Sequence, residues 1–406
     1  MKCGLLGRKL GHSYSPQIHA FLGKYSYDLF EKEPEAIEDF LKNGDFSAIN
    51  VTIPYKKDVI PYCKELSPCA EAMGAVNTIV RRSDGSLIGH NTDHFGFTSM
   101  VEHAGLTPAG KKVLVLGSGG ASNTAVRVME EMGANVVIIS RTGDNNYTNL
   151  HLHRDASIIV NATPVGMFPN NGTSPLSLDG FPKLEGVLDM IYNPSRTKLL
   201  LEAAQRGLVA ENGLWMLVAQ AKEAAEWFTG SQISDEVIGL IHKTLSVQME
   251  NIILIGMPGC GKSTIASLLA QRTNRKLLDA DMAIAQKAGK SIPELFAQDG
   301  EAVFRQIETE VLSDFGKQSG CIVSTGGGCV THERNYPLLH QNGTIFWLQR
   351  DLNLLPTDGR PLSQANKLSE MYSVRKPMYQ YFSDYTIDNN GSPEATVDQI
   401  LSILEV

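Results

Sequence analysis

The chain has 406 residues, of which 42% are hydrophobic and 20% are charged, and its formal net charge is −8. The length predicts two or three globular domains, and the acidic balance gives no reason to expect nucleic acid as a partner. The six cysteines are scattered without a C-x-x-C pair, and no apolar run approaches the ~20 residues of a membrane span. We therefore expect reduced thiols, a cytoplasmic location and no membrane partner.

The first hundred residues alternate short strands with helical stretches. Strands are expected at 3–7, 47–53 and 78–82. A helix is expected from Ser15, which would serve as its N-cap, with Pro16 in the first turn. This alternation predicts an α/β domain.

From Lys111 the pattern becomes a regular βαβ unit. A strand at 113–116 leads through the glycine-rich turn 117–122 into a helix that ends near Gly133, and the next strand is expected at 135–140. Further strands of the same parallel sheet are expected at 157–161 and 186–191. The order of strand, turn, helix and strand predicts a Rossmann fold that binds a dinucleotide at Gly117, Gly119, Gly120 and Ala121.

The residues after the second strand of this unit indicate which dinucleotide is bound. An NAD enzyme would place an acidic side chain there for the ribose 2′-hydroxyl, but this chain has Ser140, Arg141 and Thr142. A guanidinium and a hydroxyl suit a 2′-phosphate. The sequence predicts NADP, although Asp144 close behind leaves NAD open.

The last part of the chain begins with a second nucleotide motif. Helical sequence over 213–248 is followed, with almost no linker, by an apolar strand at 251–255 and the phosphate-binding loop 256–264. Its backbone amides would cradle the phosphates of ATP, Lys262 would reach the β and γ phosphates, and Ser263 would hold Mg²⁺. The loop residues expected to bind the nucleotide are Gly256, Gly259, Gly261, Lys262, Ser263 and Thr264.

Several segments within residues 1–248 resemble one family in sequence order. The stretches 11–19, 50–56, 74–78 and 89–93 are similar to the substrate motifs of shikimate dehydrogenase, and 161–167, 189–194 and 213–220 to its cofactor-side and closing-helix segments. The resemblance implies Lys56 as proton donor and Asp93 as its partner. It also implies substrate contacts from Ser13, Ser15, Thr52, Asn77, Tyr192 and Gln220, and cofactor contacts from Asn161, Thr163 and Gly213.

Residues 251–406 resemble shikimate kinase through 278–281, 296–305, 324–328, 359–362 and 374–379. The resemblance implies Asp281 as base or orienter of the substrate hydroxyl, Asp279 as support for Mg²⁺, and Arg360 as a charge-neutralising residue in the lid. The remaining substrate contacts would come from Arg305, Arg375 and three consecutive glycines, Gly326, Gly327 and Gly328. Arginines suit a carboxylate through bidentate pairing, and glycines let backbone amides approach a ligand closely.

These observations predict a bifunctional α/β enzyme. The expected domains are a substrate domain at 1–104 with a closing helix at 213–248, a Rossmann domain at 105–212, and a P-loop kinase at 249–406. The reactions would be reduction of 3-dehydroshikimate to shikimate with NADPH and phosphorylation of shikimate with ATP and Mg²⁺. A quinate or broad-specificity dehydrogenase, a different kinase such as a gluconate kinase, and a C-terminal module that only senses nucleotide remain as alternatives. The sequence does not predict the oligomeric state.

Overall fold

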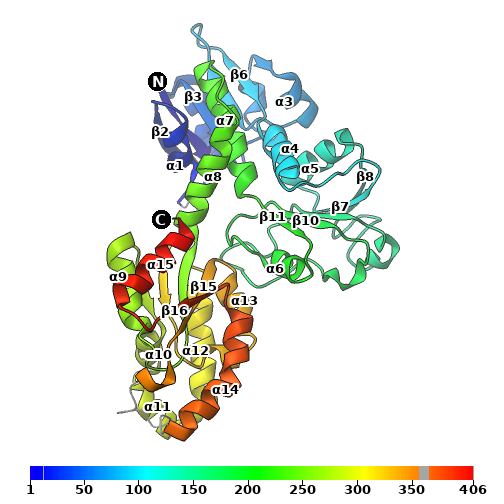
Figure 1. Ribbon diagram of the computed structural model, residues 1–406. Coiled ribbons are helices and arrows are strands. Elements are labelled where there is room, and N and C mark those ends of the chain that lie inside the picture. The colour runs from blue at the N-terminus through cyan, green and yellow to red at the C-terminus, as the bar shows by residue number, and fades with distance from the viewer. Residues whose placement is uncertain (12, 356–364, 406) are drawn as a thin grey trace. The chain divides into compact units, whose positions relative to one another are not determined.

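The computed structural model describes residues 1–11, 13–355 and 365–405. The chain divides into two compact units (Figure 1). The first contains residues 1–165, 174–192 and 202–244, and the second contains 166–173, 193–201 and 245–406. The expected substrate and Rossmann domains therefore share the first unit, and two short segments of the expected Rossmann range are grouped with the kinase residues. The three-domain division stays a prediction.

A mixed sheet of six strands occupies the N-terminal part of the first unit, in the order β2-β1-β3-β5-β6-β4. Strand β1 pairs in parallel with β2 and β3, whereas β5 pairs antiparallel with β3 and β6. The strands expected at 3–7, 47–53 and 78–82 are confirmed as β1, β3 and β5. The elements of this part are β1 (Lys2–Gly7), α1 (Ser15–Leu22), β2 (Ser26–Glu31), α2 (Ile37–Asn43), β3 (Ala48–Val51), β4 (Glu65–Leu66), α3 (Pro68–Met73), β5 (Thr78–Arg81), β6 (Leu87–His90) and α4 (Asp93–His103).

The expected cap of the first helix is wrong by one residue. Tyr14 is the N-cap of α1, and no side chain caps the helix. Ser15 is already inside the helix, is buried, and lines a cavity described below. Its side chain therefore faces a ligand site instead of closing the helix end.

A parallel sheet of five strands, in the order β11-β10-β9-β7-β8, forms the second part of this unit. The expected Rossmann strands are confirmed, and β11 is an additional edge strand. Strands β8 and β9 flank β7 on opposite sides, so the glycine-rich turn after β7 lies at the point where the strand order reverses, where such sheets bind nucleotides. The elements are β7 (Lys112–Leu116), α5 (Gly120–Glu131), β8 (Asn135–Ile139), β9 (Ile158–Asn161), β10 (Gly186–Asp189), α6 (Lys198–Gln205) and β11 (Val209–Asn212).

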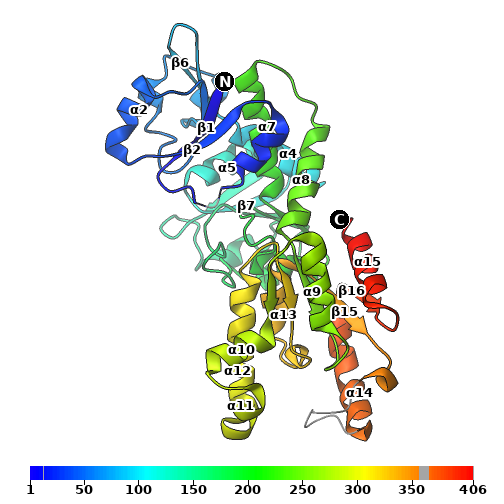
Figure 2. The same ribbon diagram turned by 90° about the vertical axis from the view of Figure 1, so that its left-hand side faces the viewer.

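The helical sequence over 213–248 forms two helices, not the single closing helix that was expected. Helix α7 (Leu214–Thr229) ends at Gly230, whose φ of 67° is left-handed, and α8 (Glu236–Met249) follows after a short loop. Helix α7 lies against the N-terminal sheet although it is far away in sequence (Figures 1 and 2). There Ala224 and Phe228 pack with Cys3 and Ala48, so the C-terminal end of the dehydrogenase sequence completes the core of its beginning.

The second unit contains another parallel sheet of five strands, in the order β13-β14-β12-β15-β16. Strand β12 (Asn251–Ile255) is central and buried at every position, which explains its uninterrupted apolar sequence. Helix α9 packs against α15, and α12 packs against α10 and α13. The other elements are α9 (Lys262–Thr273), β13 (Leu277–Asp279), α10 (Ala280–Ala288), α11 (Ile292–Gln298), α12 (Gly300–Gly316), β14 (Ile322–Ser324), α13 (Asn335–His340), β15 (Gly343–Gln349), α14 (Ala365–Phe382), β16 (Tyr385–Asp388) and α15 (Pro393–Leu404).

Candidate active sites

A cavity of about 330 Å³ lies within the first unit, between the ends of its two sheets and α7. It brings together side chains from segments that are far apart in sequence. Predicted residues that line it are Ser13, Ser15, Thr52, Lys56, Asn77, Asp93, Ala121, Tyr192, Gly213 and Gln220.

Lys56 and Asp93 form an ion pair in the wall of this cavity. The ammonium nitrogen of Lys56 lies 2.5 Å from Oδ2 of Asp93, and the side chains are 29% and 16% exposed. The other carboxylate oxygen, Oδ1, accepts a hydrogen bond of 2.9 Å from Nδ2 of Asn77. Asp93 is also the first residue of α4, where the helix dipole favours a negative charge. The arrangement holds a proton-bearing lysine beside a carboxylate that fixes its direction.

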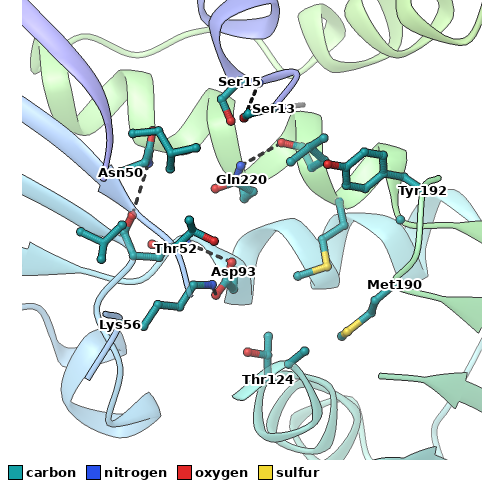
Figure 3. A pocket seen from close by; sticks show the side chains of 17 residues that line it. Ser13, Ser15, Asn50, Thr52, Lys56, Asp93, Thr124, Met190, Tyr192 and Gln220 are labelled. Atoms are coloured by element: carbon teal, nitrogen blue, oxygen red, sulfur yellow. Dashed lines mark hydrogen bonds and ion pairs between the residues drawn. The ribbon is translucent and has the colours of Figure 1, made fainter. Parts of the chain in front are cut away.

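The two ends of the cavity differ in character (Figure 3). Ser13, Ser15 and Gln220 lie at one end, while Thr124 and Met190 lie at the other, with Lys56 and Asp93 between them. Hydroxyl and amide groups suit a ligand with several hydroxyls. The less polar end is formed by residues of the Rossmann part. A flat cofactor ring at this end would face a polar substrate at the other end, with Lys56 between them.

The expected dinucleotide residues lie at the carboxyl ends of β7, β8 and β9. A side chain on Gly119 or Gly120 would meet no atom within 4 Å, so open space borders both glycines at the start of α5. A helix N-terminus with free backbone amides suits a pyrophosphate. Arg141 follows β8 with an exposed side chain, as a contact to an outlying 2′-phosphate would require. Ser140 and Thr142 flank it, and Gly117 forms the turn with a φ of 111°.

Asn161, which was expected to contact the cofactor, uses its amide within the protein. Its Nδ2 donates to Oδ1 of Asp189 at 3.0 Å, and its Oδ1 accepts from the backbone nitrogen and the hydroxyl of Thr163. Both residues thereby shape the turn after β9. Their contact with a cofactor stays a prediction.

A second cavity, of about 520 Å³, lies in the second unit beside the phosphate-binding loop. It also joins residues predicted from separate motifs. Those that line it are Gly259, Gly261, Lys262, Ser263, Thr264, Asp281, Arg305, Gly326, Gly327, Gly328 and Arg375. Gly256 lies just outside this lining, at the end of β12.

The side chain of Lys262 forms hydrogen bonds with the backbone of the phosphate-binding loop. Nζ of Lys262 donates to the carbonyl oxygens of Gly256 and Met257, at 3.0 and 3.1 Å. The hydroxyl of Ser263 donates to Oδ2 of Asp279 at 3.2 Å, and Oδ1 of Asp279 caps α10. Within the described residues no cluster of three or more His, Cys, Asp or Glu could hold a metal. The neighbouring oxygens of Ser263 and Asp279 fit Mg²⁺, which needs few protein oxygens when phosphates and water complete its shell.

Arg305 is held in place by acidic residues on its own helix. Its Nη1 donates to Oε2 of Glu308 at 2.8 Å, and its Nη2 donates to Oε1 of Glu301 at 3.1 Å. A side chain on Gly328 would approach the Arg305 guanidinium to within 2.3 Å, so a larger residue there would displace the guanidinium. Burial raises the pKa of Glu308, and the Arg305 charge opposes that effect. The guanidinium is thus oriented before any ligand binds.

Arg375 lies against the same glycines. Its Nη1 donates to the carbonyl oxygen of Gly327 at 3.1 Å, which also accepts from the hydroxyl of Tyr379 at 2.5 Å. With Arg305 it gives this cavity two guanidinium groups for an anionic substrate. Arg360, the expected lid residue, lies outside the described residues.

The sequence reasoning missed residues that line both cavities. In the first unit these include Asn50, which begins the motif containing Thr52 and Lys56 and could have been found there. The apolar residues Met190, Met216 and Leu217 carry no chemical signal in a sequence. In the second unit Glu308 was missed, although an acidic residue three positions after Arg305 on one helix is a recognisable pair.

The comparisons with known proteins agree with this geometry. The family model of the shikimate dehydrogenase substrate binding domain matches residues 5–79, and the shikimate kinase model matches 258–405. The shikimate dehydrogenase (NADP(+)) of Caldicellulosiruptor saccharolyticus is 36% identical over 259 residues, which are 56% of this chain and 92% of that protein. The N-terminal part of the chain belongs to the shikimate dehydrogenase family.

Solved shikimate dehydrogenases share the fold. Shikimate dehydrogenase 1 from Peptoclostridium difficile is 36% identical, with a TM-score of 0.56, and the match covers 61% of this chain and 98% of that one. The Thermus thermophilus enzyme in complex with NADP(H) and shikimate is 30% identical, with a TM-score of 0.55, and the match covers 60% and 99%. The prediction of a dehydrogenase fused to a shikimate kinase is confirmed at the level of both families. Among the described residues, no helix has the length and apolar character needed to cross a membrane.

Proposed function

We propose that this chain reduces 3-dehydroshikimate to shikimate with NADPH and then phosphorylates shikimate with ATP. The observation that carries the first activity is the Lys56–Asp93 pair, 2.5 Å apart in the wall of a cavity lined by hydroxyl and amide groups. A phosphate-binding loop that shares a cavity with Asp281, Arg305 and Arg375 carries the second. The hydroxyl made by the reduction would be the acceptor of the phosphoryl group, so the fusion joins a producer to its consumer.

In the reduction, this chain supplies binding, orientation and a proton. Ser13, Ser15 and Gln220 would hold the hydroxyls and the carboxylate of the substrate, which leaves the ketone oxygen toward Lys56. NADPH, when bound, supplies the hydride that reaches the carbonyl carbon. Lys56 gives its proton to the carbonyl oxygen as negative charge develops there, and Asp93 keeps the lysine directed at that oxygen.

In the phosphorylation, Arg305 and Arg375 would bind the substrate carboxylate, and Asp281 would accept or orient the hydroxyl proton. The released oxygen attacks the γ-phosphorus of ATP, and ADP leaves with the β–γ bridging oxygen. Lys262 turns from the loop carbonyls toward the phosphates, and Ser263 and Asp279 support Mg²⁺. Most of the rate gain in such transfers comes from positioning and from charge neutralisation.

The NADP preference depends on Arg141, and the shikimate preference depends on the polar end of the first cavity. A quinate dehydrogenase that uses NAD would need the same fold and a similar proton donor. It would differ in turning over quinate with NAD at a rate comparable to shikimate with NADP. A nucleotide-sensing module would bind ATP at the loop and transfer no phosphoryl group.

One coupled assay tests the whole proposal. Purified protein is mixed with 3-dehydroshikimate, NADPH and Mg-ATP, and both the loss of NADPH absorbance and the appearance of shikimate 3-phosphate are followed. We expect NADPH loss without ATP, and phosphate transfer only when both nucleotides are present. If NADPH is consumed but no phosphorylated product appears, the C-terminal half is only a binding module. If no NADPH is consumed, the proposed reductase activity is rejected.

A further inference from the structure

A continuous chain of hydrogen bonds leads from the hydroxyl of Tyr27, on the edge strand β2, to the Lys56–Asp93 pair. The hydroxyl of Tyr27 donates to Oδ1 of Asn50 at 2.7 Å, and Nδ2 of Asn50 donates to the hydroxyl of Thr78 at 3.2 Å. That hydroxyl donates to Oδ1 of Asn77 at 3.1 Å. Nδ2 of Asn77 then donates to Asp93 at 2.9 Å.

The amide of Asn50 is oriented by its surroundings. Its Nδ2 also faces the backbone carbonyl oxygen of Asn77 at 3.4 Å, and two acceptors, that carbonyl and the Thr78 hydroxyl, require the nitrogen on this side. Its oxygen must then accept a hydrogen bond from the other side, where the Tyr27 hydroxyl lies. Both hydrogens of the Asn50 amide are therefore used within the protein. Asn50 lines the cavity, yet it has no amide donor left for a substrate.

The next two groups in this series of hydrogen bonds, the Thr78 hydroxyl and the Asn77 amide, are oriented in the same way. Because the Thr78 hydroxyl accepts from Asn50, its hydrogen is free for Oδ1 of Asn77. The backbone nitrogen of Thr92 donates to that oxygen as well, at 2.8 Å, so the nitrogen of the Asn77 amide is turned toward Asp93. Every donor in the chain points the same way, toward the carboxylate that holds Lys56.

The groups in this series of hydrogen bonds are buried, so each of them depends on its protein partner and has little freedom to move. Asn50 and Asn77 are 5% and 3% exposed, and Thr78 is fully buried, so a lost partner leaves a polar group without water to replace it. Burial raises the pKa of Tyr27 well above its usual value, so its hydroxyl keeps its proton and can donate at neutral pH. Tyr27 also contacts the hydroxyl of Ser15, which lines the cavity.

We propose that Tyr27 is a positioning residue of the reductase, acting through Asn50, Thr78 and Asn77 to aim the Asp93 carboxylate at Lys56. The inference rests on the proposed reductase activity and adds a residue that touches neither substrate nor cofactor. It also assigns Asn50 to the support of the catalytic pair instead of to substrate binding.

The test removes single hydroxyls without changing shape. Tyr27→Phe and Thr78→Val break the chain at its start and in its middle, and the double variant breaks it at both points. Each single variant should lower kcat for reduction about three- to tenfold, the equivalent of one ordinary hydrogen bond, with KM for 3-dehydroshikimate nearly unchanged. The double variant should lower kcat no further than the more damaging single variant does, because the effects of residues that act as one unit are not additive.

Three controls separate a positioning role of Tyr27 from a general loss of stability in the first unit. Tyr55→Phe removes a hydroxyl that donates to the backbone carbonyl oxygen of Lys32 at 2.5 Å and contacts no member of this series, and it should leave kcat unchanged even if the Tm falls. Thr78→Ser keeps the hydroxyl and should retain near wild-type turnover. NADPH binding by the same variants, measured by fluorescence titration, reports whether the first unit, which contains the changed residues, remains folded.

The outcomes are distinct. Wild-type kcat in Tyr27→Phe, losses that multiply in the double variant, or an equal loss in Tyr55→Phe would each overturn the inference. A rise in KM alone would also overturn it, because Tyr27 would then act on the substrate through Ser15. If the wild-type protein itself fails to reduce 3-dehydroshikimate, the proposed function fails, and that result is visible before any variant is made.

Discussion

At the scale of single residues, two residues of the same type differ in function because they contact different side chains. Lys56 stands beside Lys57 in the sequence, and a lysine pair of this kind is usually a solvated surface feature. In the structure Lys57 is exposed, whereas Lys56 turns into the cavity and pairs with Asp93. The two neighbours differ because the segment after β3 turns one of them toward α4.

Replacing Lys56 by Ala should abolish reduction while shikimate phosphorylation stays near wild type. The proton donor would be lost from one of two separately cored parts, and general acid catalysis usually contributes ~10²-fold or more. Steady-state assays of both activities on the same preparation measure this, and Asp281→Asn, which should have the reverse pattern, is the matched control. A reductase rate within about tenfold of wild type would remove Lys56 from the mechanism.

Replacing Arg141 by Ala should weaken NADPH binding and leave NADH nearly untouched, because only NADPH carries the 2′-phosphate. A charge-assisted contact contributes ~1.5 to 3 kcal/mol, which corresponds to about ten- to a hundredfold in affinity. Fluorescence titration with each cofactor measures the difference. Equal losses for both would mean that Arg141 supports the adenine or the fold, and the NADP preference would need another origin.

At the scale of elements, the strands that were predicted have a clear hydrophobic pattern, but the buried strand β15 of the kinase sheet and short edge strands such as β11 were not predicted. Strand β11 (Val209–Asn212) has one glutamate among four residues and none of its residues is fully buried, so its sequence looks like a loop. It forms because β10 offers a free parallel edge, which no local pattern reveals. The break between α7 and α8 was missed for a related reason, since one glycine inside a helical pattern is often tolerated.

Glu211 on this strand should make stability depend on pH. Burial raises the pKa of Glu211 from 4.5 to about 7. The folded state therefore holds its proton more tightly than the unfolded state, so the stability present below pH 4.5 is lost as pH rises to about 7. Glu211→Gln, which stays neutral, should raise the Tm at pH 8 relative to wild type and have little effect at pH 4.

Thermal unfolding at both pH values checks this expectation. Glu130→Gln, an exposed change on α5, is the control and should show the same small effect at each pH. A Glu211→Gln protein that is equally stable to wild type at pH 8 would show that water reaches the carboxylate.

At the scale of the whole molecule, the hydrophobic core of the kinase half is drawn entirely from residues between Ile252 and Leu401. A core that needs no outside side chain should fold alone. The fragments 1–248 and 249–406 should each keep their own activity within about tenfold of the full chain, because each retains its own sheet, core and nucleotide site. The kinase fragment should have a lower Tm, since segments 166–173, 193–201 and 245–248 of its compact unit are then missing.

Expressing the two fragments separately and assaying each tests this division. An insoluble or inactive kinase fragment would show that the three missing segments are needed for its fold. Mixing active fragments and timing the lag before shikimate 3-phosphate appears then measures whether covalent fusion matters. A lag equal to that of the full chain would mean that shikimate is not passed directly between the sites.

The sequence by itself determined those features whose ligands come from consecutive residues. The loop 256–264 and the turn 117–122 were found because their own backbone amides form the site, and the strands before them have uninterrupted apolar runs. The motif order then identified both families. Tertiary structure alone decided which side chains meet: Lys56 and Asp93 are 37 positions apart, and Thr92 and Gln220 are 128 apart. It also decided that Ser15 lines a cavity instead of capping a helix, and that the Asn50 amide is used by Tyr27 and Thr78. Such pairings depend on how strands and helices pack, because hydrogen bonds and ion pairs act over a few ångströms in space whatever the separation along the chain.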